Sequence, residues 1–274
     1  MRRRNFLATA TGLAAGVATP LAALAQQEKS ERPGGRGGER RECYEIQTYT
    51  FATPEKQKAF AEFAGKAFVP ALTRAGVATV GLFEPITDDT GKKPDEPMLF
   101  LVLRHAGLRG VTALQRKLSE DTALTEAGKG ILDAPQKDPA FKSLDTALLV
   151  AFKGMPELVA PADKSDKRVY EIRIYQSHSL AKAQKKIDMF NDGEIAIFQS
   201  KGPKPVFYGE RVAGSLMPCL TYMISSESME AHKAAWGQFG GSPEWKKMNG
   251  DPQYADTVSN IIKYYLRALP GSQF

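Results

Sequence analysis

The chain has 274 residues, of which 42% are hydrophobic and 25% are charged, and its formal net charge is +6. Residues 1–25 contain three arginines and no acidic residue, so the rest of the chain carries only +3 (6 − 3 = 3). Such a weak positive charge gives no electrostatic reason to expect binding to nucleic acid, and we predict no nucleic-acid partner.

The first 25 residues have the features of an export signal. Three arginines, Arg2–Arg4, precede a weakly apolar run over Phe6–Leu24, and Ala23 and Ala25 form a small-x-small cleavage site. The sequence Arg-Arg-Asn-Phe-Leu that starts at Arg3 is typical of a twin-arginine motif. We therefore predict a twin-arginine signal peptide over residues 1–25, a periplasmic location and no stable membrane span after cleavage. The alternative is an uncleaved membrane anchor, which the glycines and the proline of the apolar run disfavour.

Residues 26–42 are polar throughout and contain no apolar side chain that would compensate the entropy of ordering, so we expect a disordered linker. The two cysteines, Cys43 and Cys219, lie in predicted strands and form no Cys-x-x-Cys pattern. Export to an oxidising compartment allows a disulfide between them. We interpret them instead as two buried free thiols.

The body of the chain repeats itself at a fixed offset. The segment Tyr44–Tyr49 (YEIQTY) reappears as Tyr170–Tyr175 (YEIRIY), and the offset of 126 (170 − 44 = 126) also relates Gly76 to Gly202. A duplicated module of this size is one supersecondary unit used twice, and each copy is expected to bury a face against the other. We place the first repeat at residues 43–153, a linker at 154–168 and the second repeat at 169–274.

The residue patterns predict the same order of elements in both repeats. Alternation predicts strands, and apolar spacing of three and four residues predicts helices. In the first repeat we expect strands at Cys43–Thr50, Val77–Glu84, Met98–Leu103 and Ala147–Phe152, and helices at Glu55–Arg74, Leu108–Lys117 and near Thr122–Leu132. In the second we expect strands at Val169–Tyr175, Pro205–Arg211, Cys219–Ile224 and Ile261–Leu269, and helices at Leu180–Ser200, capped by Ser179 and ended by Gly202, and at Ser226–Phe239.

The order of elements in each repeat is βαββαβ, which gives an antiparallel sheet with both helices on one face. The other face must also be covered. Two such sheets placed face to face cover each other and enclose a barrel-like interior. We therefore predict an α+β fold in which the two repeats form an intramolecular, barrel-like pseudo-dimer.

Strand alternation divides the residues of Tyr170–Tyr175 into two rows. The more apolar row, Tyr170, Ile172 and Ile174, is expected to pack under the helices. The polar row is then expected to face the second sheet and to line a ligand pocket; it consists of Glu171, Arg173 and Tyr175, together with Glu45, Gln47 and Tyr49 of the first repeat. The alternative is that Glu171 and Arg173 form a structural ion pair, because buried charges must be paired.

Three elements of the second repeat carry a family resemblance. The Tyr-Glu-Ile-Arg-x-Tyr strand, the helix that ends at Gly202 and the Ser-Pro-Glu-Trp element at Ser242–Trp245 together resemble the NIPSNAP family, which is similar to the dimeric α/β-barrel superfamily of ferredoxin-like modules. The resemblance covers residues 44–270 as two copies, and with its leader the chain looks like exported tandem-repeat members from bacteria.

The first copy departs from the family pattern, since Gln47 stands where the second copy has Arg173, so a site built on Arg173 is expected to be asymmetric. The resemblance implies the fold but no settled reaction, because the superfamily includes cofactor-free monooxygenases, haem-handling enzymes and isomerases.

His178 is the candidate catalytic residue, because it follows the strand that bears Arg173 and Tyr175 and because an imidazole exchanges protons near neutral pH. The alternative is an exposed loop histidine. The sequence contains no metal-ligand spacing, P-loop, Gly-x-Gly-x-x-Gly or Gly-x-Ser-x-Gly motif, so it indicates no metal and no cofactor.

The sequence as a whole favours a protein that binds a small organic molecule between its two sheets, with metal-free catalysis left open. One alternative is a non-catalytic interaction module, in which side chains would fill the barrel interior; a weaker one is a haem-handling enzyme with His178 as ligand. A cavity of ~300 Å³ or more would favour small-molecule binding. Whether the protein forms a homo-oligomer is left open.

Overall fold

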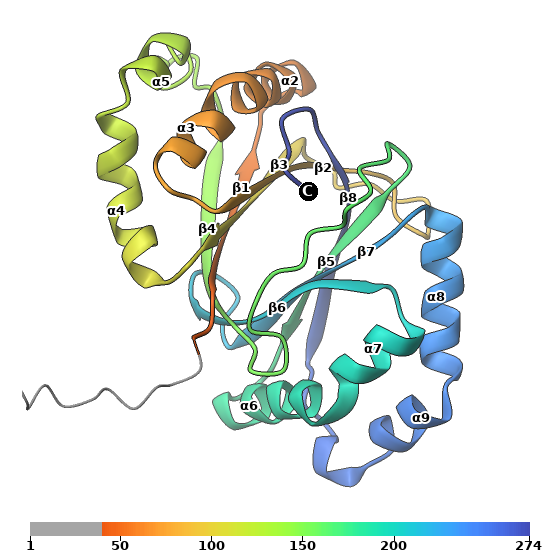
Figure 1. Cartoon of the computed structure of the whole chain (residues 1–274). Coiled ribbons are helices and arrows are strands. Elements are labelled where there is room, and N and C mark those ends of the chain that lie inside the picture. The colour runs from red at the N-terminus through yellow and green to blue at the C-terminus, as the bar shows by residue number, and fades with distance from the viewer. Residues whose placement is uncertain (1–39) are drawn as a thin grey trace, which may run out of the picture. The chain divides into compact units, whose positions relative to one another are not determined.

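The structure is a computed structural model that describes residues 40–274; the predicted signal peptide, with its cleavage site at Ala23 and Ala25, and most of the predicted linker lie outside this range. Eight strands form a closed barrel in the order β1-β3-β2-β8-β5-β7-β6-β4, and all neighbouring strands are antiparallel (Figure 1). The prediction of an α+β fold with a closed antiparallel barrel is confirmed.

The first half of the body follows the predicted order. Its strands are β1 (Cys43–Thr50), β2 (Thr79–Pro85), β3 (Met98–His105) and β4 (Ser143–Ala151), and its helices are α2 (Pro54–Phe63), α3 (Val69–Arg74), α4 (Leu108–Ser119) and α5 (Thr122–Ala127). Strands β3 and β4 are longer than predicted, because β1 pairs with both along its whole length, including the polar stretch from Ser143 to Thr146.

The second half repeats this order. Its strands are β5 (Val169–Gln176), β6 (Lys204–Ala213), β7 (Cys219–Ser226) and β8 (Asn260–Ala268), and its helices are α6 (Leu180–Met189), α7 (Ile195–Lys201), α8 (Met229–Gly241) and α9 (Pro243–Asn249). Ser179 caps α6 as predicted, since its hydroxyl accepts from the Lys182 amide at 3.3 Å. Trp245 lies in the first turn of α9 and is partly buried, whereas Phe141 precedes β4 and lies outside any helix.

A π-helical turn interrupts the long first helix of each half. The two turns, Ala64–Phe68 and Phe190–Glu194, start 126 positions apart (190 − 64 = 126), which is the offset of the sequence repeat. A π turn inserts one extra residue into a helix and is rare in proteins. Its recurrence at the repeat offset means that the two halves share a local irregularity as well as an order of elements.

The helices of the two halves cover opposite outer sides of the barrel (Figure 1). This arrangement creates three apolar cores, one inside the barrel and one beneath each helix layer. The barrel core receives inward-facing side chains from all eight strands, among them Ile46, Phe100, Ile172, Met223 and Leu266. An eight-stranded barrel is just wide enough for such side chains to fill.

The predicted orientation of the two rows on β5 is wrong. Tyr170, Ile172 and Ile174 belong to the core inside the barrel, whereas Tyr175 belongs to the core beneath the second helix layer. Glu171 and Arg173 lie on the same helix-facing side and contact α8. The physical reason is that the barrel interior is enclosed on all sides, so the apolar row gains most there. Charged groups find partners more readily beneath helices, which supply side chains of their own.

One end of the barrel is plugged by Phe274, which is 1% exposed. Its ring packs against Phe83 and Tyr170, and the neighbouring Gln273 pairs with Val80 of β2 through hydrogen bonds of 2.9 and 2.8 Å. Residues 272–274 therefore close the barrel at the end where β5 begins, and any opening to the interior lies at the other end.

Cys43 and Cys219 are both buried and free, as predicted, and they lie on opposite faces of the barrel wall. Across residues 40–274, no helix is long and apolar enough to cross a membrane.

Candidate functional site

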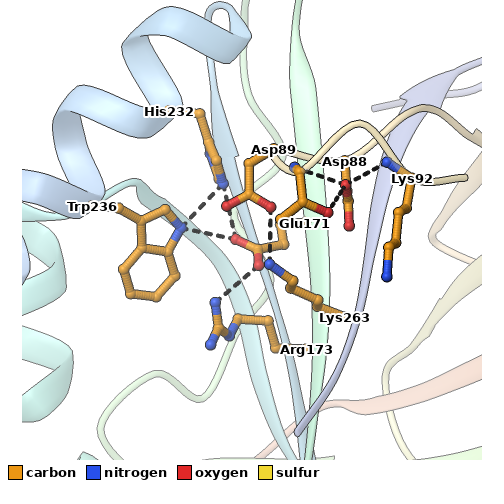
Figure 2. A network of polar contacts seen from close by, with 9 residues as sticks. Asp88, Asp89, Lys92, Glu171, Arg173, His232, Trp236 and Lys263 are labelled. Carbon is orange, nitrogen blue, oxygen red and sulfur yellow. Dashed lines mark hydrogen bonds and ion pairs between the residues drawn. The ribbon is translucent and has the colours of Figure 1, made fainter.

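The polar row of β5 lies beneath helix α8 and forms a hydrogen-bonded group that we call the Glu171 cluster, consisting of Glu171, Arg173, His232 and Trp236 (Figure 2). Glu171 Oε2 accepts from His232 Nε2 at 2.8 Å and from Trp236 Nε1 at 2.9 Å, while Oε1 accepts from Arg173 at 2.9 Å. Glu171 and His232 are both 0% exposed. The carboxylate has therefore exchanged its water shell for three protein donors.

The donors around Glu171 match an ionised carboxylate. Such a group only accepts, so His232 Nε2 carries a hydrogen, while His232 Nδ1 lies 3.1 Å from Ser226 Oγ. Burial by itself would raise the pKa of Glu171, but the bond from His232 and the charge of Arg173 hold that pKa below its usual range. Glu171 is therefore ionised at neutral pH.

Arg173 is held by charge and by aromatic faces. Its guanidinium lies 4.6 Å from the centre of the Trp236 ring and 5.4 Å from that of Tyr175. Burial opposes its charge, but the oxygens of Tyr222, Tyr175 and Glu171 outweigh this effect and raise the pKa of Arg173. The structural ion pair that the sequence left as an alternative is thus present, and a ligand-binding role for Glu171, Arg173 and Tyr175 stays a prediction.

The first half has a related network on its own helix-facing side. Glu45 Oε2 lies 3.1 Å from His105 Nε2, and Glu45 Oε1 accepts from Gln47 at 2.7 Å. Gln47 in turn accepts from the Tyr49 hydroxyl at 3.1 Å. The predicted residues Glu45, Gln47 and Tyr49 are therefore brought together, but a neutral amide replaces the guanidinium, so this network contains no arginine.

The two histidines that bind these carboxylates come from different elements. His105 is at the end of β3, opposite Cys43 in register, and the corresponding position at the end of β7 is Ser226, opposite Val169. In the second half the imidazole comes instead from His232 on α8. The sequence repeat therefore does not relate the two histidines.

His178 lies on the loop after β5, and its side chain is 46% exposed. Its Nε2 is 3.6 Å from Asp256 Oδ2. The loop is at the end of the barrel opposite Phe274, but the imidazole belongs neither to the Glu171 cluster nor to the first-half network. A catalytic role for His178 stays a prediction.

The open end of the barrel contains a cavity of about 210 Å³. Seven of the eight strands contribute to its wall, with Ile46, Phe100, Ala147, Ile172, Arg211, Thr221 and Tyr264. We call it the barrel cavity. It lies between the two halves, where the sequence analysis expected a ligand, but the residues that line it are those of the inward row and not the predicted ones.

Arg211 is the functional candidate that the sequence analysis missed. Strand β6 has a bulge between Pro205 and Phe207, which shifts its pairing with β7 by one residue. Counted from Pro205, simple alternation would place Arg211 on the outer face of the barrel, but after the bulge it faces inward. Arg211 pairs in register with the inward-facing Leu149 and is 5% exposed. Glu210 and Arg211 are adjacent charged residues in this strand, and the bulge concealed which of the two side chains points inward.

Other hollows lie on the outer surface. One of about 580 Å³ lies between α2 and residues 269–271; of its charged side chains, Lys58, Glu62 and Lys66 are exposed and Glu84 is half-buried. We therefore give more weight to the smaller barrel cavity, because it encloses a buried charge. Among the residues from Arg40 onward, no group of three or more His, Cys, Asp or Glu side chains is arranged to hold a metal ion.

The closed antiparallel barrel with helices on its outer sides is of the dimeric α/β-barrel type. A solved structure with this fold, a proposed monooxygenase from Fusobacterium nucleatum subsp. nucleatum, is similar with a TM-score of 0.56. The two chains are 9% identical, and the match covers 85% of this chain and 94% of that chain. At this identity the similarity establishes the fold alone.

The second half of the body has a match in sequence as well. The family model NIPSNAP matches residues 170–273, which confirms the predicted resemblance for this half. A NIPSNAP-like domain protein from Burkholderia xenovorans is 17% identical, with 39% of this chain and 90% of that chain covered and a TM-score of 0.35. A mutant chlorite dismutase from Candidatus Nitrospira defluvii in complex with cyanide is 8% identical, with 83% and 91% covered and a TM-score of 0.44. No curated protein matches the sequence significantly.

Proposed function

We propose that the protein is an exported pseudo-dimer of two NIPSNAP-like repeats that binds a small organic molecule between its two sheets. The observation that carries this proposal is the barrel cavity, which is walled by both halves and contains polar side chains among apolar ones. Ligand sites commonly have this composition, with an apolar lining and a few placed polar groups.

The proposal of two repeats rests on three shared features. Read from β4, the barrel consists of the order β4-β1-β3-β2 followed by β8-β5-β7-β6, which is the same order twice. The π turns start at the repeat offset, and Glu45 and Glu171, which are also separated by this offset, each bind a histidine, although the histidines come from different elements. The proposal of export to the periplasm rests on the twin-arginine sequence and the cleavage site within residues 1–25.

The volume of the cavity restricts the ligand. About 210 Å³ is below the ~300 Å³ that would by itself favour small-molecule binding over an interaction module, so the proposal rests on the composition of the cavity wall, and a ligand that fits must be smaller than a drug-sized molecule. Side chains do not fill the barrel interior completely, as they would in the interaction module. Haem does not fit this cavity, because the space is too small and no histidine lines it.

Native mass spectrometry of the protein purified from its own exported compartment tests the proposal. We expect a small molecule that stays bound in the native spectrum and is lost on unfolding. Ala147→Leu, which extends a side chain into the cavity, should abolish this added mass, whereas Ala231→Leu at an exposed position of α8 should retain it. An added mass that survives Ala147→Leu in folded protein would place the ligand elsewhere and contradict the proposal.

A further inference from the structure

Arg211 is buried inside the barrel without a counterion. Its Nη1 donates to the Ser215 carbonyl oxygen at 2.8 Å, and its Nη2 donates to Thr221 Oγ1 at 3.0 Å. Both acceptors are neutral, and within residues 40–274 Arg211 forms no ion pair with a carboxylate. Burying an unpaired charge is costly, and natural proteins normally avoid it or use it.

The guanidinium is also incompletely hydrogen-bonded. The Arg211 Nε atom is buried and has no hydrogen-bond partner among the residues that the structure describes. The side chain lines the barrel cavity, and its two bonds to Ser215 and Thr221 hold the guanidinium plane in place. A planar guanidinium fixed in this way matches the planar, two-oxygen geometry of a carboxylate.

An acidic residue stands at the outer rim of the same cavity. Asp145 is exposed and accepts from Ser215 Oγ at 2.8 Å, so Ser215 bridges Asp145 and Arg211 without bringing their charges together. The cavity wall therefore contains one buried cationic side chain and one exposed anionic side chain, while Ile46, Phe100 and Ile172 supply apolar surface.

We propose that the ligand of the barrel cavity is a small organic carboxylate whose anionic group is bound by Arg211. This inference rests on the proposed function and specifies its chemical class. The carboxylate supplies the missing counterion for the guanidinium, and the short carbon chain contacts the apolar wall. Asp145 at the rim favours acids that carry a hydrogen-bond donor, such as a hydroxyl or ammonium group, at their other end.

Calorimetric titration of the full chain with matched ligands tests this inference. The probes are short carboxylates of two to five carbons, the amide and alcohol of the same chain length, and inorganic phosphate and sulfate. We expect carboxylates to bind, the neutral analogues to bind at least tenfold more weakly, and Arg211→Gln to remove the preference. Arg116→Gln, an exposed arginine on α4, is the matched control and should bind like the original chain.

Each of the other possible results of this titration contradicts a different part of the proposal. Equal binding of amides and carboxylates would overturn the statement that the ligand is a carboxylate, but it would still support a ligand in the barrel cavity. Phosphate or sulfate binding as tightly as the carboxylates would replace the organic acid by an inorganic anion. Binding of no probe, with no retained mass in the native spectrum, would overturn the proposed function itself. If Arg211→Gln does not fold, Thr221→Val, which removes one bond that orients the guanidinium, should still weaken carboxylate binding.

Discussion

The Glu171 carboxylate and the His232 imidazole lie 2.8 Å apart and are both wholly buried between strand β5 and helix α8. Glu45 and His105 form the same kind of bond at 3.1 Å in the first half. The two pairs differ in the other partner of the carboxylate. Glu171 also binds the charged Arg173, whereas Glu45 also binds the neutral Gln47. The halves therefore serve as controls for each other in stability measurements.

Glu171→Ala should destabilise the protein more than Glu45→Ala. Removing Glu171 leaves the Arg173 charge buried without its partner, which typically costs about 3–5 kcal/mol. Removing Glu45 leaves Gln47 and His105 without this partner but strands no arginine, which costs about 1–3 kcal/mol. Urea denaturation of both variants measures the difference, and equal losses would show that Arg173 contributes no uncompensated charge.

The stability of the fold should fall in acid partly through Glu171. Its pKa in the folded state is below that in the unfolded chain, about 4.3, so the unfolded state binds more protons between these two values. The stabilisation is therefore fully present above about pH 4.3 and is lost as the pH falls through the folded-state pKa. Glu171→Gln should flatten the dependence of unfolding free energy on pH in this window. An unchanged slope would mean that the carboxylate is not stabilised in its ionised form.

Both thiols should be unreactive in the native protein. Burial raises the pKa of Cys43 and of Cys219, and for Cys219 the charge of Arg211 opposes this rise. We expect alkylation by iodoacetamide at pH 8 to be more than tenfold slower in the native than in the unfolded chain, followed by mass spectrometry. Arg211→Gln should slow Cys219 further and leave Cys43 unchanged. Equal effects on both thiols would contradict the placement of Arg211 beside Cys219.

Phe274→Ala should destabilise the barrel as a core truncation does, by about 3–5 kcal/mol, because the ring is 1% exposed and packs on Phe83 and Tyr170. Gln273→Ala is the matched control, since it removes side-chain hydrogen bonds of the same segment and should cost about 1 kcal/mol. Thermal and urea denaturation compare the two. Similar small effects would mean that residues 272–274 are not part of the cooperative core.

Particular residues show how much of the structure could be predicted from the sequence. The strand at Cys43–Thr50, the cap at Ser179 and the helix end at Gly202 are local patterns, and the structure contains all three. The face assigned to Glu171 was wrong because alternation says which residues share a face but not which face is better enclosed. Arg211 was missed because a bulge in β6 reverses the alternation before it.

The sequence by itself determined the duplicated order of strands and helices, because the periodicity of neighbouring residues and the repetition of segments can both be recognised without knowing the fold. Only the tertiary structure decided that the two sheets close into one barrel, that the apolar rows fill it and that Arg211 lies unpaired at its open end. The physical reason is that burial and charge pairing depend on segments far apart in the chain. Arg211 is held by residues of its own hairpin, but it is enclosed by strands from both halves.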